Sequence, residues 1–134
     1  MQIPPNAHVA VVDGERFLLM RQGGGADPTL EFEDEPDVSE SGESGAFGHH
    51  DTDAKSDNSR TMDKLDHAAG VAGWLNRAVL QHRIEQLLIV ADPDTLGEMR
   101  RHYHKETEAA LIGEIDKQLT GMPGPDIAKA IAAA

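Results

Sequence analysis

The side chains best suited to chemistry lie close together in the middle of the chain. Residues 49–53 read His-His-Asp-Thr-Asp, so His49, His50, Asp51 and Asp53 place two imidazoles and two carboxylates within five positions. These groups are common metal ligands, and a bound metal would support hydrolytic chemistry. A metal site also needs ligands that converge with supporting hydrogen bonds. The Gly- and Ser-rich surroundings do not supply that support, so we interpret this segment as a polar loop and expect no cofactor.

Two other patterns are typical of reactive sites but lack their usual context. Residues 22–25 read Gln-Gly-Gly-Gly, yet no helix with Lys and Ser or Thr follows, as a phosphate-binding loop requires. We predict a flexible turn there. Ser39, Ser41 and Ser44 have no neighbouring base and no nucleophile-elbow sequence. The sequence therefore predicts no catalytic residue.

A small basic cluster lies further along the chain, where residues 102–105 read His-Tyr-His-Lys behind Arg100 and Arg101. These residues are predicted to end a helix, and the helix dipole favours cations at that end. Capping therefore explains them. Contact between Arg100, Arg101, Lys105 and nucleic acid is the alternative.

The net charge of −12 is distributed unevenly. Ten acidic side chains and one basic side chain lie within residues 31–59, so that segment carries −9 of the total. Proteins that bind nucleic acid usually present clustered Lys and Arg, so this distribution makes direct nucleic-acid binding doubtful. An acidic segment of this kind could instead bind a basic partner protein.

The absence of cysteine excludes disulfides, thiolate catalysis and Cys-based zinc sites. The N-terminus has no signal-peptide pattern. The longest apolar run, Leu87–Ala91, is far shorter than the roughly 20 residues of a membrane helix. We expect a cytoplasmic protein that does not contact a membrane.

The first part of the chain predicts three strands. Residues 8–12 form a β-branched apolar run, and Asp13-Gly14 followed by Arg-Phe-Leu-Leu-Met-Arg at 16–21 indicates a tight hairpin. Residues 30–33 alternate apolar and acidic side chains, which predicts a third strand with one face in water.

Residues 36–60 are rich in Ser, Gly, Asp, Glu and His, with Val38 and Phe47 as the only sizeable apolar side chains. Such a composition buries too little apolar surface to offset the entropy of ordering. We expect a disordered acidic loop within a single domain that spans residues 1–134, because the length suits one core.

The second half alternates helices and strands. A helix is predicted from about Thr61, where apolar residues recur at helical spacing, and residues 86–91 predict a buried central strand. Asp92-Pro93 then begins a helix that is expected to extend through Tyr103. Residues 111–115 predict a strand, with helix as the alternative. Ile127 and Ile131 form one face of a short last helix. The fold class is therefore α/β, a mixed sheet of about five strands covered by helices.

Several of these segments also resemble a known family. The apolar strand at 87–91, Asp92-Pro93 and Thr-Leu-Gly-Glu-Met-Arg at 95–100 resemble the host-attachment protein family, as do His104-Lys105-Glu106 and residues 113–120. The likeness extends over about 84–131, and more weakly over 7–33. The family-motif positions are Asp92, Pro93, Thr95, Leu96, Gly97, Glu98, Arg100, His104, Lys105, Glu114, Asp116 and Lys117.

That family is named for bacterial proteins described as required for attachment to host cells, and it resembles the central domain of the archaeal and eukaryotic peptide-chain release factor and Pelota. The resemblance implies a release-factor-like mixed sheet and a link to the ribosome. A release factor needs Gly-Gly-Gln to hydrolyse peptidyl-tRNA, and that tripeptide is absent from this sequence. The family's Arg-rich central loop is here acidic, with only Phe47 retained.

The leading hypothesis is therefore a non-enzymatic host-attachment-type protein that acts through ribosome or protein contact. The first alternative is a metal-dependent hydrolase that uses the His and Asp side chains of the loop. The second is an acidic adaptor that binds a basic partner.

Overall fold

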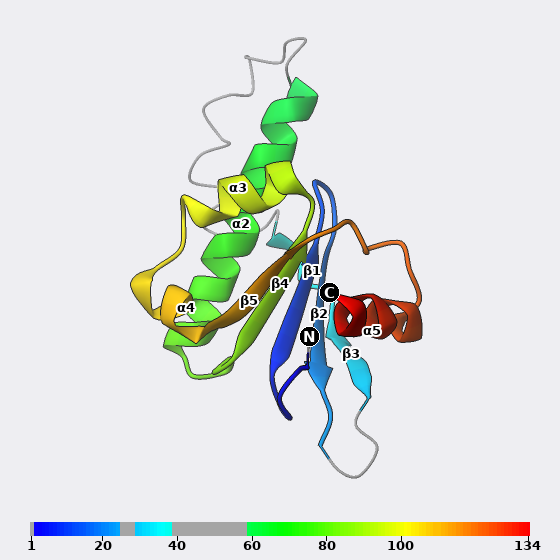
Figure 1. The fold of residues 1–134 in the computed structure, drawn as a ribbon. Coiled ribbons are helices and arrows are strands. Elements are labelled where there is room, and N and C mark those ends of the chain that lie inside the picture. Colours follow the sequence, from blue (N-terminus) through cyan, green and yellow to red (C-terminus); the bar gives the residue numbers. More distant parts are fainter. Residues whose placement is uncertain (1, 25–28, 39–58) are drawn as a thin grey trace.

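Five strands form one mixed sheet in the order β3-β2-β1-β4-β5 (Figure 1). The structure is a computed structural model that describes residues 2–24, 29–38 and 59–134, with residues 59–63 described by their backbone alone. The sheet is covered by α2 (Ser59–Leu80), α3 (Pro93–Arg100), α4 (Lys105–Ala110) and α5 (Gly124–Ala133). The predicted α/β class with a five-stranded mixed sheet is confirmed.

The first three strands are β1 (His8–Val12), β2 (Phe17–Gln22) and β3 (Leu30–Asp34), and they are joined as antiparallel neighbours. Asp13 closes the first turn, where its backbone N–H donates to the Arg16 carbonyl. Gly23 and Gly24 follow β2, and Gly23 N donates to Thr29 O just before β3. Residues 25–28 lie outside the described residues, so the predicted flexible turn stays a prediction.

The last two strands, β4 (Leu87–Ala91) and β5 (Leu111–Asp116), lie on the other side of β1 and run parallel to it. All five residues of β4 are buried, because helices cover both faces of the sheet at this strand. An uninterrupted apolar run is the pattern expected for such a strand.

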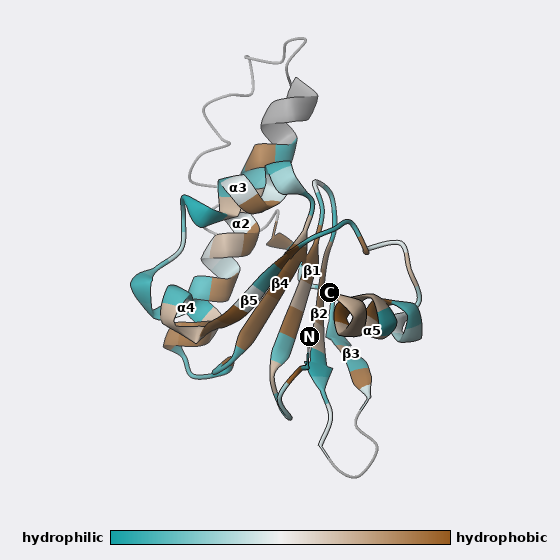
Figure 2. Ribbon diagram, in the orientation of Figure 1, coloured by the Kyte–Doolittle hydropathy of each residue, from teal (hydrophilic) through white to brown (hydrophobic). Residues whose placement is uncertain are grey.

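The sheet has a hydrophobic core on each face. Successive side chains of β1 point to opposite faces of the sheet. Ala10 and Val12 lie on the face covered by α2 and α3, and Val9 and Val11 lie on the face covered by α5. Figure 2 shows the hydrophobic residues concentrated along the central strands. On the α2 face, Trp74 packs edge-on against Phe17 with ring centroids 5.3 Å apart. On the opposite face, α5 contributes Ile127 and Ile131, as predicted.

The helical region after β4 differs from the prediction. The helix that begins at Asp92-Pro93 ends at Arg100 instead of continuing through Tyr103, and a separate helix, α4, follows. The Arg101 N–H bonds the last turn of α3, and the His104 side chain begins α4. His102–His104 therefore connect two helices and Lys105 is the first residue of α4, so these residues do not cap the C-terminal end of one helix.

Two further residues depart from their expected environments. Phe32 in β3 is 60% exposed, although the alternating pattern placed its face toward the core. Val38, which belonged to the predicted acidic loop, is only 2% exposed and joins the core under α2. The first helix also begins at Ser59, inside the range expected to be a loop. Residues 39–58 lie outside the described residues, so the rest of that prediction stays a prediction.

Among the described residues, no helix combines the length and the apolar character that spanning a bilayer would require.

Candidate functional site

Three aspartates lie at the carboxyl edge of the parallel strands. Asp13 follows β1, Asp92 follows β4 and Asp116 ends β5, and the register pairs Val12 with Ala91. The chain leaves β1 toward β2 and leaves β4 toward β5, so the path diverges between these neighbours. Ligand sites of open α/β sheets usually lie at such a point, so this edge is the first place to look for function.

Asp13 holds the carboxyl edge together through three hydrogen bonds. One carboxylate oxygen accepts from the backbone N–H groups of Glu15 and Arg16, each at 2.7 Å, and the other accepts from the Thr120 hydroxyl. Partial burial raises the pKa of Asp13, but the bonds from Thr120 and the two amides outweigh burial and hold the pKa below its usual value. The carboxylate is therefore ionised and fully engaged at neutral pH.

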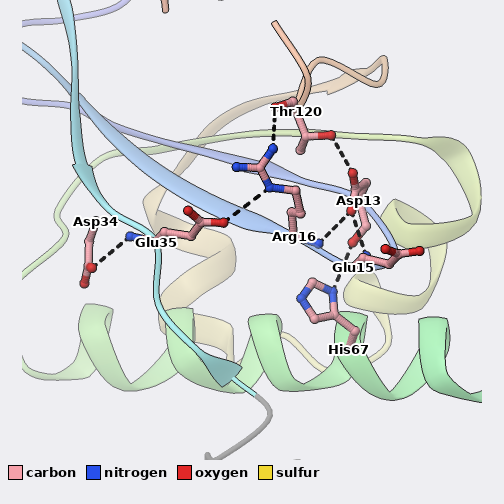
Figure 3. Close-up of polar contacts among 7 residues, drawn as sticks. All are labelled: Asp13, Glu15, Arg16, Asp34, Glu35, His67 and Thr120. Atoms are coloured by element: carbon pink, nitrogen blue, oxygen red, sulfur yellow. Dashed lines mark hydrogen bonds and ion pairs between the residues drawn. The ribbon is translucent and has the colours of Figure 1, made fainter. Parts of the chain in front are cut away.

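Arg16 extends the same network (Figure 3). Its Nε lies 3.3 Å from a Glu35 oxygen, and its Nη1 donates to the Thr120 carbonyl at 3.4 Å. Thr120 belongs to the segment that crosses from β5 to α5 over this edge (Figure 1). We call Asp13, Arg16, Glu35, His67 and Thr120 the carboxyl-edge network.

His67 joins this network from α2. Its Nδ1 lies 3.0 Å from the backbone carbonyl of Asp13. A carbonyl oxygen can only accept, so Nδ1 carries the proton and Nε2 keeps its lone pair. Burial lowers the pKa of His67 more than the contact with Asp13 raises it, so the ring is neutral at pH 7.

Two cavities flank the network. One of about 360 Å³ is lined by Asp13, Gly14, Glu15, Lys64, Asp92 and Gln118. The stem of Lys64 lies over Gly14, where an added Cβ would come 2.6 Å from Lys64 Cε. The other, of about 350 Å³, is bordered by His67 together with Glu35 and Asp37. A neutral imidazole beside carboxylates is suited to accept a proton, yet no serine, threonine or other hydroxyl lines this second cavity among the described residues.

The neutral state of His67 predicts a specific acid sensitivity. A group whose folded pKa lies below its unfolded value resists protonation only in the folded state, so stability falls as the pH drops below about 6.5. Replacing His67 with Asn keeps a donor near the Asp13 carbonyl but removes the titration. We expect urea midpoints between pH 7.5 and 5.5 to fall less in His67→Asn than in the wild type. Parallel pH dependences in the two proteins would contradict this.

The family-motif positions have structural roles in the connection between β4 and β5. Asp92 caps α3 by accepting from Thr95 N at 3.2 Å, with Pro93 in the first turn. His104 caps α4, where its Nδ1 accepts from Glu106 N at 3.0 Å. Leu96 lies in the core. The polar residues that precede α3 and α4 in the motif are therefore explained by their roles as helix caps.

The basic cluster is neutralised by acidic neighbours. Arg100 donates to Glu114 Oε1 from Nε at 3.0 Å and from Nη2 at 2.8 Å, and this pairing raises the pKa of Arg100 further. Glu98 lies 2.9 Å from His102 and 3.5 Å from Arg101. Lys105, Asp116 and Lys117 are exposed, and Gly97 has open space where a side chain would be. The structure therefore gives no structural reason for glycine at that last position.

Burial raises the pKa of Tyr103, and the neighbouring Glu114 raises it further, so the phenol stays protonated and donates to that carboxylate at 3.3 Å. Glu114 thus receives bonds from two residues of the α3–α4 connection. This explains why a carboxylate on an edge strand is part of the motif.

Asn76 is the principal residue that the sequence did not single out. Its Nδ2 donates to the His102 carbonyl at 2.8 Å, and its Oδ1 accepts from His104 N at 2.9 Å and from the Thr107 hydroxyl at 2.6 Å. One amide thereby ties α2 to the connection and to α4. A single polar residue in a helical pattern gives no sequence signal for such a role.

The carboxyl-edge network was also missed. The sequence singled out Asp13 only as a turn residue, and His67 and Thr120 were not considered. A useful signal was present, because an aspartate directly after a buried strand lies at the carboxyl edge of a parallel sheet. The predicted metal candidates His49, His50, Asp51 and Asp53 lie outside the described residues. Within the part that the structure describes, no three His, Asp or Glu side chains form a metal-binding group.

Comparison with known proteins tests the resemblance directly. No curated protein matches the chain. A sequence model of bacterial archaeo-eukaryotic release factor family 12 matches residues 6–131, which is nearly the whole chain. The release-factor-like part of the predicted resemblance is confirmed, whereas the host-attachment part is not. The chain belongs to bacterial archaeo-eukaryotic release factor family 12.

Proposed function

We propose that this protein acts by contact with the ribosome or with a protein bound to it, and that it does not hydrolyse peptidyl-tRNA. The observation that carries the proposal is a release-factor family match over residues 6–131 in a sequence without the Gly-Gly-Gln tripeptide. The scaffold is retained and the residues that a release factor needs for hydrolysis are missing.

The charges favour contact with protein over contact with RNA. Arg100 and Arg101, the two arginines of the basic cluster, are paired with Glu114 and Glu98. A phosphate bound at either guanidinium would compete with the carboxylate that the guanidinium already faces. The net charge of −12 opposes approach to a phosphate backbone as well.

The carboxyl-edge network also supports a scaffold role, because its polar groups are used in hydrogen bonds within the fold. The carboxylate of Asp13 and the Nδ1–H of His67 are used in bonds between elements of the fold. Groups that are committed to holding a turn, a helix and a crossing segment together are not free to act on a substrate.

Cosedimentation through a sucrose cushion tests the ribosome branch. We expect a fraction of the purified protein to pellet with ribosomes at physiological salt. The matched control is the protein alone in the same buffer. Complete absence from the ribosomal pellet would exclude this branch and leave protein partners away from the ribosome.

Attachment to host cells, from a cytoplasmic location, is a finer proposal that rests on the resemblance of residues 84–131. It predicts that deleting the gene lowers adhesion and that the protein fractionates with the cytosol, so that its effect on adhesion is indirect. Normal adhesion of a deletion strain would contradict the role, and recovery of the protein at the cell surface would contradict its indirect nature.

A further inference from the structure

The most open backbone in the described part of the molecule lies along β3. This strand is at one end of the sheet and pairs with β2 on one side only. Four of its five residues are exposed, whereas β5, the strand at the other end, is mostly half-buried. The outer side of β3 therefore presents backbone N–H and C=O groups that another strand can pair with.

An exposed aromatic side chain marks the same strand. Phe32 pairs in register with Met20, a residue of the core under α5, and is 60% exposed. Leu30, two residues earlier and so on the same face, packs against that core. Phe32 thus continues the apolar surface of the core out into solvent on the α5 side of the sheet.

A groove of about 1020 Å³ begins at Leu30, two residues before Phe32 on the same strand. Leu30 borders it on the strand side, Ile3 and Pro4 border it from the N-terminal segment, and α5 provides the opposite wall. That wall consists of Pro125, Ala128, Lys129 and Ala132, at helical spacing and separate from the Ile127 and Ile131 stripe that packs on the sheet. The two alanines of this wall permit close approach of another chain, and Lys129 is its one long side chain.

The charges along β3 indicate which kind of segment could bind at its open edge. Glu33 lies 3.6 Å from the Arg21 guanidinium and 3.2 Å from the His8 ring, and Glu35 is paired with Arg16. Glu31 and Asp34 have no basic partner within the described part of the chain. The open edge is thus apolar at Phe32 and anionic on either side of it, which complements a segment that alternates basic and apolar side chains.

We propose that a basic, extended segment of a partner protein adds to β3 as a further strand, with an apolar side chain seated against Phe32 and in the groove beside α5. The proposal rests on the proposed function, since it names the surface through which a protein contact is made. Acidic side chains on an edge strand also prevent edges of like charge from pairing. The occupant is therefore a partner of opposite charge and not a second copy of this chain.

A synthetic peptide tests the surface without a known partner. The probe is a nine-residue, fluorescently labelled peptide that alternates Lys and Val, with Leu at its centre, and the matched probe has Glu in place of Lys. We expect the Lys peptide to raise the fluorescence anisotropy saturably with the full-length protein, and to bind more weakly as salt is raised. In the amide NMR spectrum, the largest shifts should fall on residues 30–34.

Two substitutions distinguish a specific contact with Phe32 from nonspecific binding of the peptide to exposed apolar side chains. Phe32→Ser should weaken the peptide at least about tenfold, because it removes a large apolar contact. Leu80→Ser is the matched control, since Leu80 is 47% exposed at the end of α2, far from β3 in the sequence, and it should leave binding unchanged. Glu31→Lys with Asp34→Lys should abolish the preference for the Lys peptide over the Glu peptide. Circular dichroism checks that each variant is folded.

The proposal is overturned if both serine variants bind equally, if the Glu peptide binds as well as the Lys peptide, or if the shifts map away from β3. It is also overturned if sedimentation shows that the protein dimerises through an interface lost in Phe32→Ser. Ribosome pelleting distinguishes the two proposals. If the wild type pellets with ribosomes but does not bind the peptide, only strand addition at β3 is contradicted. If the protein binds the peptide but never pellets with ribosomes, only the ribosome contact is contradicted.

Discussion

Replacing Asn76 with alanine is expected to lower the free energy of unfolding by about 2–3 kcal/mol. The amide makes three hydrogen bonds that join α2 to the α3–α4 connection. Removing it leaves the Thr107 hydroxyl without its acceptor at a position with 0% exposure, and an unpaired buried polar group is costly. Urea denaturation followed by circular dichroism measures the change.

A double-mutant cycle identifies the cause of that loss. Thr107→Ala removes the hydroxyl that Asn76→Ala would strand, so the double variant should be more stable than the sum of the single losses predicts. Strict additivity would show that the bond between Asn76 and Thr107 does not carry the effect. In that case the connection would be held by its other contacts.

Replacing Asp13 with alanine is expected to cost about 2 kcal/mol at pH 7, because the carboxylate accepts three hydrogen bonds at a partly exposed position. The pKa of Asp13 is lowered in the folded protein, so its contribution is complete above the unfolded value near 3.9. That contribution is lost as the pH falls through the folded pKa. The gap between wild type and variant should therefore narrow in strong acid.

The conservative variant Asp13→Asn separates charge from geometry. It keeps one carbonyl acceptor for the turn amides and loses the ionised group, so it should lie between the wild type and Asp13→Ala at pH 7. If the difference between wild type and Asp13→Ala stayed constant from pH 7 to pH 2.5, the carboxylate would not be the source of the stability.

The local patterns of the sequence predicted the sheet well because they act over short distances. Four β-branched or aliphatic residues in β1 and five in β4 are sufficient to indicate buried strands. The Asp13-Gly14 turn and the Asp92-Pro93 cap depend on neighbours within four residues. Each of these features was predicted at nearly the correct position.

The features that were missed depend on contacts between distant parts of the chain. The break between α3 and α4 is stabilised by Asn76, which lies 26 residues before His102. Helical periodicity continued through the break to Tyr103, because nothing local marks its end. Val38 is buried because α2 covers it, although its own segment is polar. The exposure of Phe32 follows from the position of β3 at the end of the sheet, where no element of the described part of the chain covers that side chain.

The candidate site shows the same division. The motif that carries the family likeness is largely a set of helix caps and ion pairs between α3 and β5. These roles hold the scaffold together. The carboxyl-edge network joins residues separated by up to 107 positions, as in the bond from Thr120 to Asp13, so no local pattern could have assembled it.

Release of a labelled peptide from peptidyl-tRNA on purified ribosomes tests the central claim most directly, with puromycin as the positive control. The protein should pellet with these ribosomes and yet release no more peptide than buffer alone, because the sequence contains no Gly-Gly-Gln. Restoration of release by a family member that has the tripeptide would show that the assay responds to this scaffold. Release by the present protein, at a rate that rises with its concentration, would contradict the claim that it acts by contact alone.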